Sequence, residues 1–220
     1  MTMSEDAVAG LTMSLFLFVM VVLPWFITGR ASRAAEPTSE ARLWVALAVL
    51  QLAIWSTLGP AERLATAEDG RLLLLLPTVA TIAIISVIWT GCRRYGFPNL
   101  LELLAAAGLA SALGMVLVRS GLPPHERTHL FEYGIVALVA YSALLVRRHS
   151  GRRTFHPWPA AFVLASSLGV IDELLQNFVP NRVFDPIDIL FNTLSVVLAL
   201  TSVAVMHGVR KLTGSPRLNR

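Results

Sequence analysis

Residues 187–208 read IDILFNTLSVVLALTSVAVMHG, and this stretch decides the class of fold. Its 22 residues contain a single charged side chain, that of Asp188. A helix of about 20 apolar residues is about 30 Å long, which matches the hydrocarbon thickness of a bilayer. The stretch therefore predicts a transmembrane helix.

Six further stretches of the chain have the same character. Over the whole chain 55% of the residues are hydrophobic and 15% are charged, against about half and about a quarter in an ordinary soluble domain. The seven predicted spans cover roughly residues 8–27, 43–59, 72–91, 99–118, 128–146, 158–179 and 187–208. The expected fold class is all-α, a polytopic transmembrane helix bundle of about seven spans.

Other classes of protein fit the sequence poorly. Cys92 is the only cysteine, which excludes a disulfide-stabilised scaffold. The formal net charge of +4 comes from basic residues between the apolar spans, so membrane topology explains it better than nucleic-acid binding. Glu5 and Asp6 precede the first span where a signal peptide would have basic residues, which favours a retained helix. The expected partner is the lipid bilayer and not a nucleic acid.

The basic residues also predict how the bundle is oriented. Alternate loops and termini hold 13 Lys and Arg residues on one side of the membrane and five on the other. The side that is rich in basic residues is expected to be cytoplasmic. This places the N-terminus outside and the C-terminus inside, with the loops 119–127 and 180–186 on the outer side.

Polar side chains enter the last three spans, and all of them lie near the predicted outer face. Spacings of three, four or seven residues place such side chains along one side of a helix, and in the sixth span they relate Asp172 to Gln176 and Glu173 to Asn177. The sets are Glu126, His129 and Tyr133; Asp172, Glu173, Gln176 and Asn177; and Asp185, Asp188 and Asn192. A charged side chain inside a bilayer usually faces a cavity or a partner. With Arg182 in the adjoining loop, three such helix ends at one depth predict a single polar pocket.

Two of the acids in the chain have a structural explanation. Asp185 precedes Pro186, and this pair is typical of a helix N-cap followed by proline at the first helical position. Glu102 lies near the predicted cytoplasmic end of the fourth span, where we expect it to reach the interface or to pair with Arg93 or Arg94.

The outer-face residues resemble the VanZ-like family of membrane proteins. The likeness extends over roughly residues 120–205 and comprises His129-x-x-x-Tyr133, Asp172-Glu173-x-x-Gln176 and Pro180-x-Arg182-x-x-Asp185-x-x-Asp188-x-x-x-Asn192. Glu126-Arg127 stands where the family tends to have Asp-Lys, and Ser195 stands where it usually has Gly. The resemblance divides the chain into residues 1–119, with four spans, and a VanZ-like part at residues 120–220, with three.

The resemblance implies a multi-pass protein of the bacterial inner membrane with a role in the cell envelope. Founding members of the family are linked to low-level resistance to the glycopeptide antibiotic teicoplanin. The first hypothesis is therefore a pocket that handles an anionic, lipid-linked envelope intermediate. In it Arg182 would grip a phosphate, and a divalent cation such as Mg²⁺, held by Asp172, Glu173 and Asp188, would offset the acids.

A catalytic version of this hypothesis is the less favoured one. A metal-bound water with His129 as general base would permit phosphoester hydrolysis. The sequence contains none of the common catalytic motifs for such a reaction, so catalysis stays open but is not favoured, and no catalytic residue is assigned.

Two other classes of function stay open. The polar stripes can also form an internal ion-pair network that fixes the bundle of an accessory or scaffold subunit in a larger membrane complex. A proton-coupled transporter would need polar residues that continue toward the cytoplasmic side. The sixth and seventh spans supply little there beyond serines, so this hypothesis ranks last.

Overall fold

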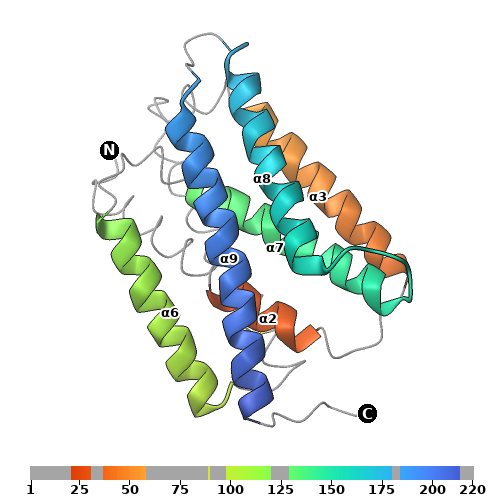
Figure 1. Ribbon diagram of the computed structural model, residues 1–220, viewed down its shortest axis with the longest axis vertical. Coiled ribbons are helices and arrows are strands. Elements are labelled where there is room, and N and C mark those ends of the chain that lie inside the picture. Colours follow the sequence, from red (N-terminus) through yellow and green to blue (C-terminus); the bar gives the residue numbers. More distant parts are fainter. Residues whose placement is uncertain are drawn as a thin grey trace.

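The computed structural model describes residues 21–30, 37–57, 89, 98–119, 129–179 and 184–213 of the chain. These residues form helices and connecting turns and contain no strand, which confirms the predicted all-α class. The helices, shown in Figure 1, are α2 (Leu23–Arg30), α3 (Pro37–Thr57), α6 (Leu100–Arg119), α7 (His129–His149), α8 (Pro157–Gln176) and α9 (Pro186–Leu212). The predicted span 72–91 lies outside the described residues, apart from Trp89.

Most helix boundaries lie close to those that the apolar stretches predict. Helices α6, α7, α8 and α9 begin and end within about four residues of the expected positions. Helix α3 differs, because it begins at Pro37 and not near residue 43. Proline suits the first helical position. The first turn that follows it is polar, so the apolar stretch alone does not indicate that the helix begins there.

Two helices in the described part of the chain, α8 and α9, are long and apolar enough to cross a membrane by length and composition. The predicted number of seven spans goes beyond this finding and stays a prediction, as does the division of the chain at residue 119.

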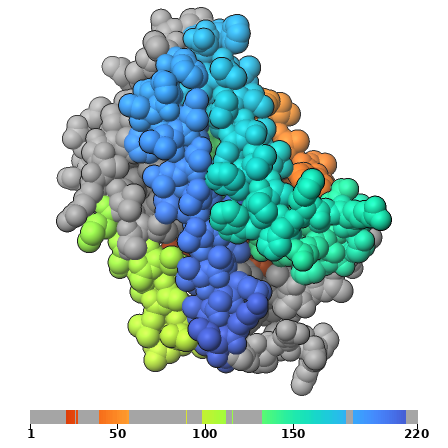
Figure 2. Space-filling model, viewed as in Figure 1, coloured from red at the N-terminus to blue at the C-terminus, as the bar shows by residue number. Residues whose placement is uncertain are grey.

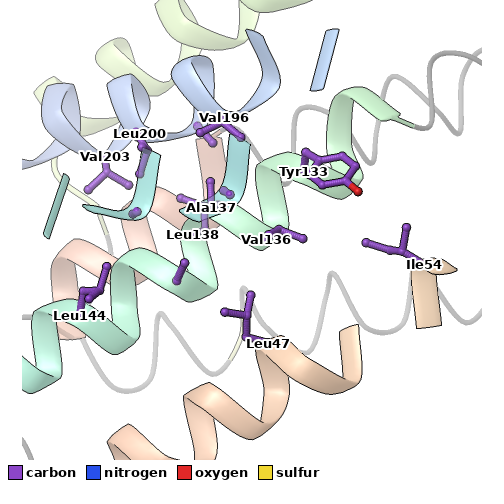
Figure 3. Close-up of a cluster of buried hydrophobic side chains, with 14 of the residues drawn as sticks. Leu47, Ile54, Tyr133, Val136, Ala137, Leu138, Leu144, Val196, Leu200 and Val203 are labelled. Atoms are coloured by element: carbon purple, nitrogen blue, oxygen red, sulfur yellow. The ribbon is translucent and has the colours of Figure 1, made fainter. Parts of the chain in front are cut away.

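Helix α7 lies in the middle of the described bundle. It packs against α9, α3 and α8, and Figure 1 shows it crossing behind α8 and α9. Side chains on several of its faces are therefore buried, among them Tyr133, Val136, Ala137, Leu138 and Ala140. Figure 3 shows Val136, Ala137 and Leu138 of this helix between α3, with Leu47 and Ile54, and α9, with Val196, Leu200 and Val203.

Helices α8 and α9 lie side by side, as Figure 2 shows, and small residues mediate their packing. The buried face of α8 carries Ala161, Ala165 and Gly169, which follow one another at intervals of four residues. Near the start of α8, Trp158 Nε1 donates a hydrogen bond of 3.2 Å to the carbonyl of Leu200 of α9. Small side chains let the two backbones approach closely, and this contact sets the position of the polar residues further along α8.

Buried acids near the basic end of the bundle are paired with arginines. Glu40 of α3 accepts hydrogen bonds from Arg147 at 3.2 Å and from Arg152 at 3.0 Å. Glu102 of α6 pairs with Arg210 of α9 at 2.9 Å. The predicted partners of Glu102, Arg93 and Arg94, lie outside the described residues, so that pairing stays a prediction. Packing of α6 on α9 brings Arg210, a residue distant in sequence, to the Glu102 carboxylate.

The turn between α7 and α8 has a defined hydrogen-bond pattern. The amide of Gly151 donates to the carbonyl of Arg148, and the amide of Arg152 donates to the carbonyl of Arg147. Gly151 has a φ of 72°, in the left-handed region. Together these features form a Schellman motif, which ends α7 and places Arg152 beside Glu40.

Replacing Gly151 tests whether this turn stabilises the fold. Gly151→Ala is expected to lower the free energy of unfolding by about 1–2 kcal/mol, since a Cβ disfavours the left-handed conformation. Gly151→Asn should lower it less, because asparagine tolerates that conformation. The measurement is the thermal midpoint of the purified protein in detergent. Equal midpoints for wild type and Gly151→Ala would show that the turn adopts another conformation.

Candidate functional site

Tyr133 on α7 is the centre of a group of buried polar side chains. Its hydroxyl accepts a hydrogen bond from Gln51 Nε2 of α3 and donates one to the carbonyl of Leu168 of α8, both at 3.4 Å. The Asp172 side chain also lies against this hydroxyl. One phenol thus joins three helices, which is possible because α7 is enclosed by the others.

The adjacent acids of α8 point to different neighbours, although both are fully buried. Consecutive helix residues are about 100° apart around the axis, so their side chains leave the helix in different directions. Asp172 turns toward Tyr133. Glu173 accepts a hydrogen bond from Gln176 Nε2 at 2.8 Å, and its carboxylate interacts with the charges of Asp185 and Asp188 at the start of α9.

Asn192 of α9 can pack closely against α8 because Gly169 has no side chain at the point of contact. A Cβ built at Gly169 would lie 3.0 Å from Asn192 Cβ and 3.5 Å from both Asn192 Nδ2 and Tyr133 Cδ1. This close contact brings α7, α8 and α9 together at one point. Only 1% of the Asn192 surface is exposed, so its amide is enclosed by the protein.

The structure brings together five of the residues that the sequence predicts for the pocket. Tyr133, Asp172, Glu173, Gln176 and Asn192 are all buried, and with Gln51 they make up what we call the polar cluster. Asp185 and Asp188 lie at its edge and are half-buried. The Arg182 backbone and side chain and the His129 side chain lie outside the described structure. Their predicted place in the pocket stays a prediction.

Asp185 has the capping role that its position before Pro186 suggested. Its side chain accepts a hydrogen bond of 2.8 Å from the amide of Ile187, and Pro186 is the first residue of α9. Capping fixes the start of α9 and so the direction in which Asp188 and Asn192 follow. The backbone of Asp185 also lies next to the Glu173 carboxylate.

Gln51 is the member of the polar cluster that the sequence argument missed. It comes from α3, in the part of the chain that the family resemblance does not cover. A signal was present, because Gln51 is a single amide in the middle of an otherwise apolar stretch. Such a side chain inside a bundle needs a hydrogen-bond partner, and here the partner is Tyr133.

Several atoms of the polar cluster lack a hydrogen-bond partner within the described part of the chain. They are Gln51 Oε1, Glu173 Oε2, Asn192 Oδ1 and Asn192 Nδ2. Buried polar atoms in native proteins almost always have such a partner, in the protein or in ordered water. A group of unsatisfied oxygens and one amide nitrogen on three helices is therefore suited to hold a polar guest, either water or part of a ligand.

The described residues do not form a ready-made metal site. Within them, no three His, Cys, Asp or Glu side chains are grouped so that they could hold a metal ion. Asp172, Glu173 and Asp188, the predicted ligands of a divalent cation, are thus not grouped as a metal site in the described structure.

No protein-family model matches the chain, and neither the curated proteins nor the solved structures include a significant match.

Replacing Gly169 tests the close contact that brings the polar cluster together. Gly169→Ala is expected to lower the free energy of unfolding by about 1–3 kcal/mol, because the new methyl group would overlap with Asn192. The matched control is Gly208→Ala on α9, where a Cβ meets no atom within 4 Å. That change should leave stability equal or higher, since alanine favours a helix. Both effects are read from thermal unfolding in detergent, and equal midpoints for the two variants would contradict the contact.

Proposed function

We propose that this chain is an integral membrane protein of the bacterial cell envelope, with about seven transmembrane helices. Its N-terminus lies outside and its C-terminus in the cytoplasm. The polar cluster, with Arg182 and His129, lines a pocket on the outer side that binds an envelope component without catalysing a reaction. The resemblance of residues 120–205 to VanZ-like proteins supports this role and connects it with teicoplanin resistance.

The observation that carries the proposal is the distribution of apolar and polar side chains. The face of α3 that points away from the bundle carries Val45, Val49 and Leu52, each exposed by 60% or more. Glu173 and Asn192, by contrast, are buried. A soluble protein rarely leaves a large apolar surface open while enclosing its acids and amides. In a bilayer this distribution is favourable, because lipid covers the apolar faces and polar groups gather inside the bundle.

The same distribution continues on α8. Val163, Val170 and Leu174 are exposed and lie along one face of the helix, at intervals of seven and four residues. The opposite face carries the small residues and the acids that pack inward. One helix thus presents an apolar side toward its surroundings and a polar end toward the bundle, as expected for a transmembrane helix that lines a pocket.

The proposed ligand is an anionic, lipid-linked envelope intermediate. The carboxylates of Asp172, Asp185 and Asp188 repel the carboxylate of Glu173. No member of the polar cluster is basic. An anion would therefore be held at the rim by Arg182, whose guanidinium can bind a phosphate through two parallel hydrogen bonds. The unsatisfied amide and carboxyl atoms would take hydroxyl or amide groups of the ligand deeper inside.

One observation favours a second function, that of an accessory or scaffold subunit in a membrane complex. The hydrogen bonds of Tyr133 to Gln51 and to Leu168 tie α3, α7 and α8 together. Bonds of this kind fix the packing of a bundle and need no ligand. A binding site requires the Glu173 carboxylate for the phenotype, whereas a scaffold requires it for stability, so a variant of Glu173 can separate the two functions.

Reporter fusions test the membrane topology. A reporter attached after Arg220 should be active in the cytoplasm, whereas one inserted in the loop 180–186 should be active outside, because basic residues are retained on the cytoplasmic side. The measurement is the activity of paired reporters that work on only one side of the membrane. An external C-terminus would place the polar cluster on the wrong side for an envelope ligand.

Two matched variants separate a binding site from a structural network. Glu173→Gln keeps the shape of the side chain and an acceptor for Gln176, and it removes a buried charge for which no described Lys or Arg is an ion-pair partner. We expect an equal or higher thermal midpoint together with loss of the teicoplanin phenotype. Glu102→Gln instead leaves the largely buried Arg210 without its partner, which should lower stability by about 3–5 kcal/mol.

The measurements are thermal unfolding in detergent, teicoplanin susceptibility of a host that expresses the protein, and unfolding with and without a polyprenyl phosphate in the micelles. A ligand that binds only the folded state raises the midpoint. Wild type should gain stability from the polyprenyl phosphate, and Arg182→Gln should lose that gain. If Glu173→Gln lowers the midpoint as strongly as Glu102→Gln, the scaffold function is favoured and the binding site is rejected.

A further inference from the structure

The connection between α7 and α8 carries a concentration of positive charge next to an exposed aromatic ring. Arg147, Arg148, Arg152 and Arg153 lie within seven residues of one another, and Phe155 follows them. Glu40 pairs with two of the four arginines, Arg147 and Arg152, so the group of five charged residues keeps a net charge of +3. In Figure 1 this connection lies at the right-hand edge of the bundle.

The two remaining arginines face outward. Arg148 and Arg153 are exposed, and neither forms an ion pair with a residue of the described ranges. Phe155 is 86% exposed and so has little contact with the rest of the described bundle. An exposed aromatic side chain in the same turn as basic groups that have no ion-pair partner among the described residues is typical of a surface that meets the headgroup region of a bilayer.

The backbone that carries these side chains is held in place. The Schellman motif at Gly151 ends α7, and the ion pairs of Arg147 and Arg152 tie both sides of the turn to α3. On the far side of the turn, Trp158 is bound to α9 and stacks on Phe162, with ring centroids 6.1 Å apart. Because the turn is already ordered, binding to Arg148 and Arg153 would not have to order it.

We propose that Arg148, Arg153 and Phe155 form a binding site for anionic phospholipid headgroups, on the side of the membrane where α7 ends. The two guanidinium groups take phosphate oxygens of the lipid, and the phenyl ring enters the boundary between headgroups and acyl chains. Arg147 and Arg152 position the site through Glu40 and do not contact the lipid phosphate. The inference shares the membrane location with the proposed function but does not depend on the polar cluster.

The test compares how the full-length protein selects lipids in a bilayer. The protein is reconstituted in phosphatidylcholine membranes with about one fifth phosphatidylglycerol, and association of spin-labelled phosphatidylglycerol is compared with that of spin-labelled phosphatidylcholine. Wild type should prefer phosphatidylglycerol. The double variant Arg148→Gln/Arg153→Gln should lower this preference by about tenfold, and Arg148→Lys/Arg153→Lys should lie between the two, since lysine keeps the charge but not the bidentate geometry.

The matched control removes the same charge elsewhere. Arg42 and Lys211 are exposed and form no ion pair with a described residue, so Arg42→Gln/Lys211→Gln should keep the wild-type preference. Equal loss in both double variants would overturn the site in favour of general attraction by net charge. Absence of a preference in wild type would overturn it as well. Phe155→Ser, which leaves every charge in place, should weaken association of the lipid and adds an independent test.

Discussion

A polar group inside an apolar bundle has to find its partner within the bundle, because neither lipid nor packed apolar side chains can provide one. At the basic end of this protein the buried acids meet that condition. Glu40 is bound by two arginines from beyond the middle of the chain, and Glu102 is bound by Arg210, whose guanidinium also lies 5.6 Å from the ring centre of Trp25. These ion pairs link α3 to α7 and α6 to α9, so the pairing of charges and the arrangement of helices depend on each other.

The polar cluster meets the same condition less completely. Gly169 allows α8 and α9 to come into contact, and this contact encloses Asn192 next to Tyr133. Tyr133 receives partners from two helices, whereas the Asn192 amide receives none from the described residues. The side chains of the polar cluster that the structure describes are acids, amides and a phenol, which offer few donors for so many oxygens. An oxygen-rich interior of this kind is completed by water, by a protonated group or by a ligand that donates hydrogen bonds.

Much of this arrangement could be predicted from the sequence, because it depends on local patterns. Apolar stretches predicted α6 to α9 closely, the Asp185-Pro186 pair predicted the start of α9, and helical spacing placed Asp172, Gln176 and Asn192 on inward faces. What could not be predicted depends on contacts between distant segments. Nothing in the sequence near Gln51 indicates Tyr133, and nothing near Glu102 indicates Arg210. Helical spacing also placed Asp172 and Glu173 in one pocket, but it could not show that α7 takes one acid and α9 the other.

The contrast between the two ends bears on the choice between binding and scaffolding. A network that served only to fix the bundle would be expected to resemble the basic end, where acids from α3 and α6 each have a cation. Natural proteins depart from such complete pairing mainly where function requires it, and the rest of the fold supplies the stability that the site lacks. Here the paired end and the packed length of α7 stabilise the bundle, so it can tolerate atoms of Glu173 and Asn192 that have no hydrogen-bond partner among the described residues. Both ends belong to one chain and one set of helices, so the difference between them cannot come from the fold class. It comes from the residues placed at each end, and at the polar cluster those residues are acids, amides and a phenol, which supports the proposal of a polar ligand.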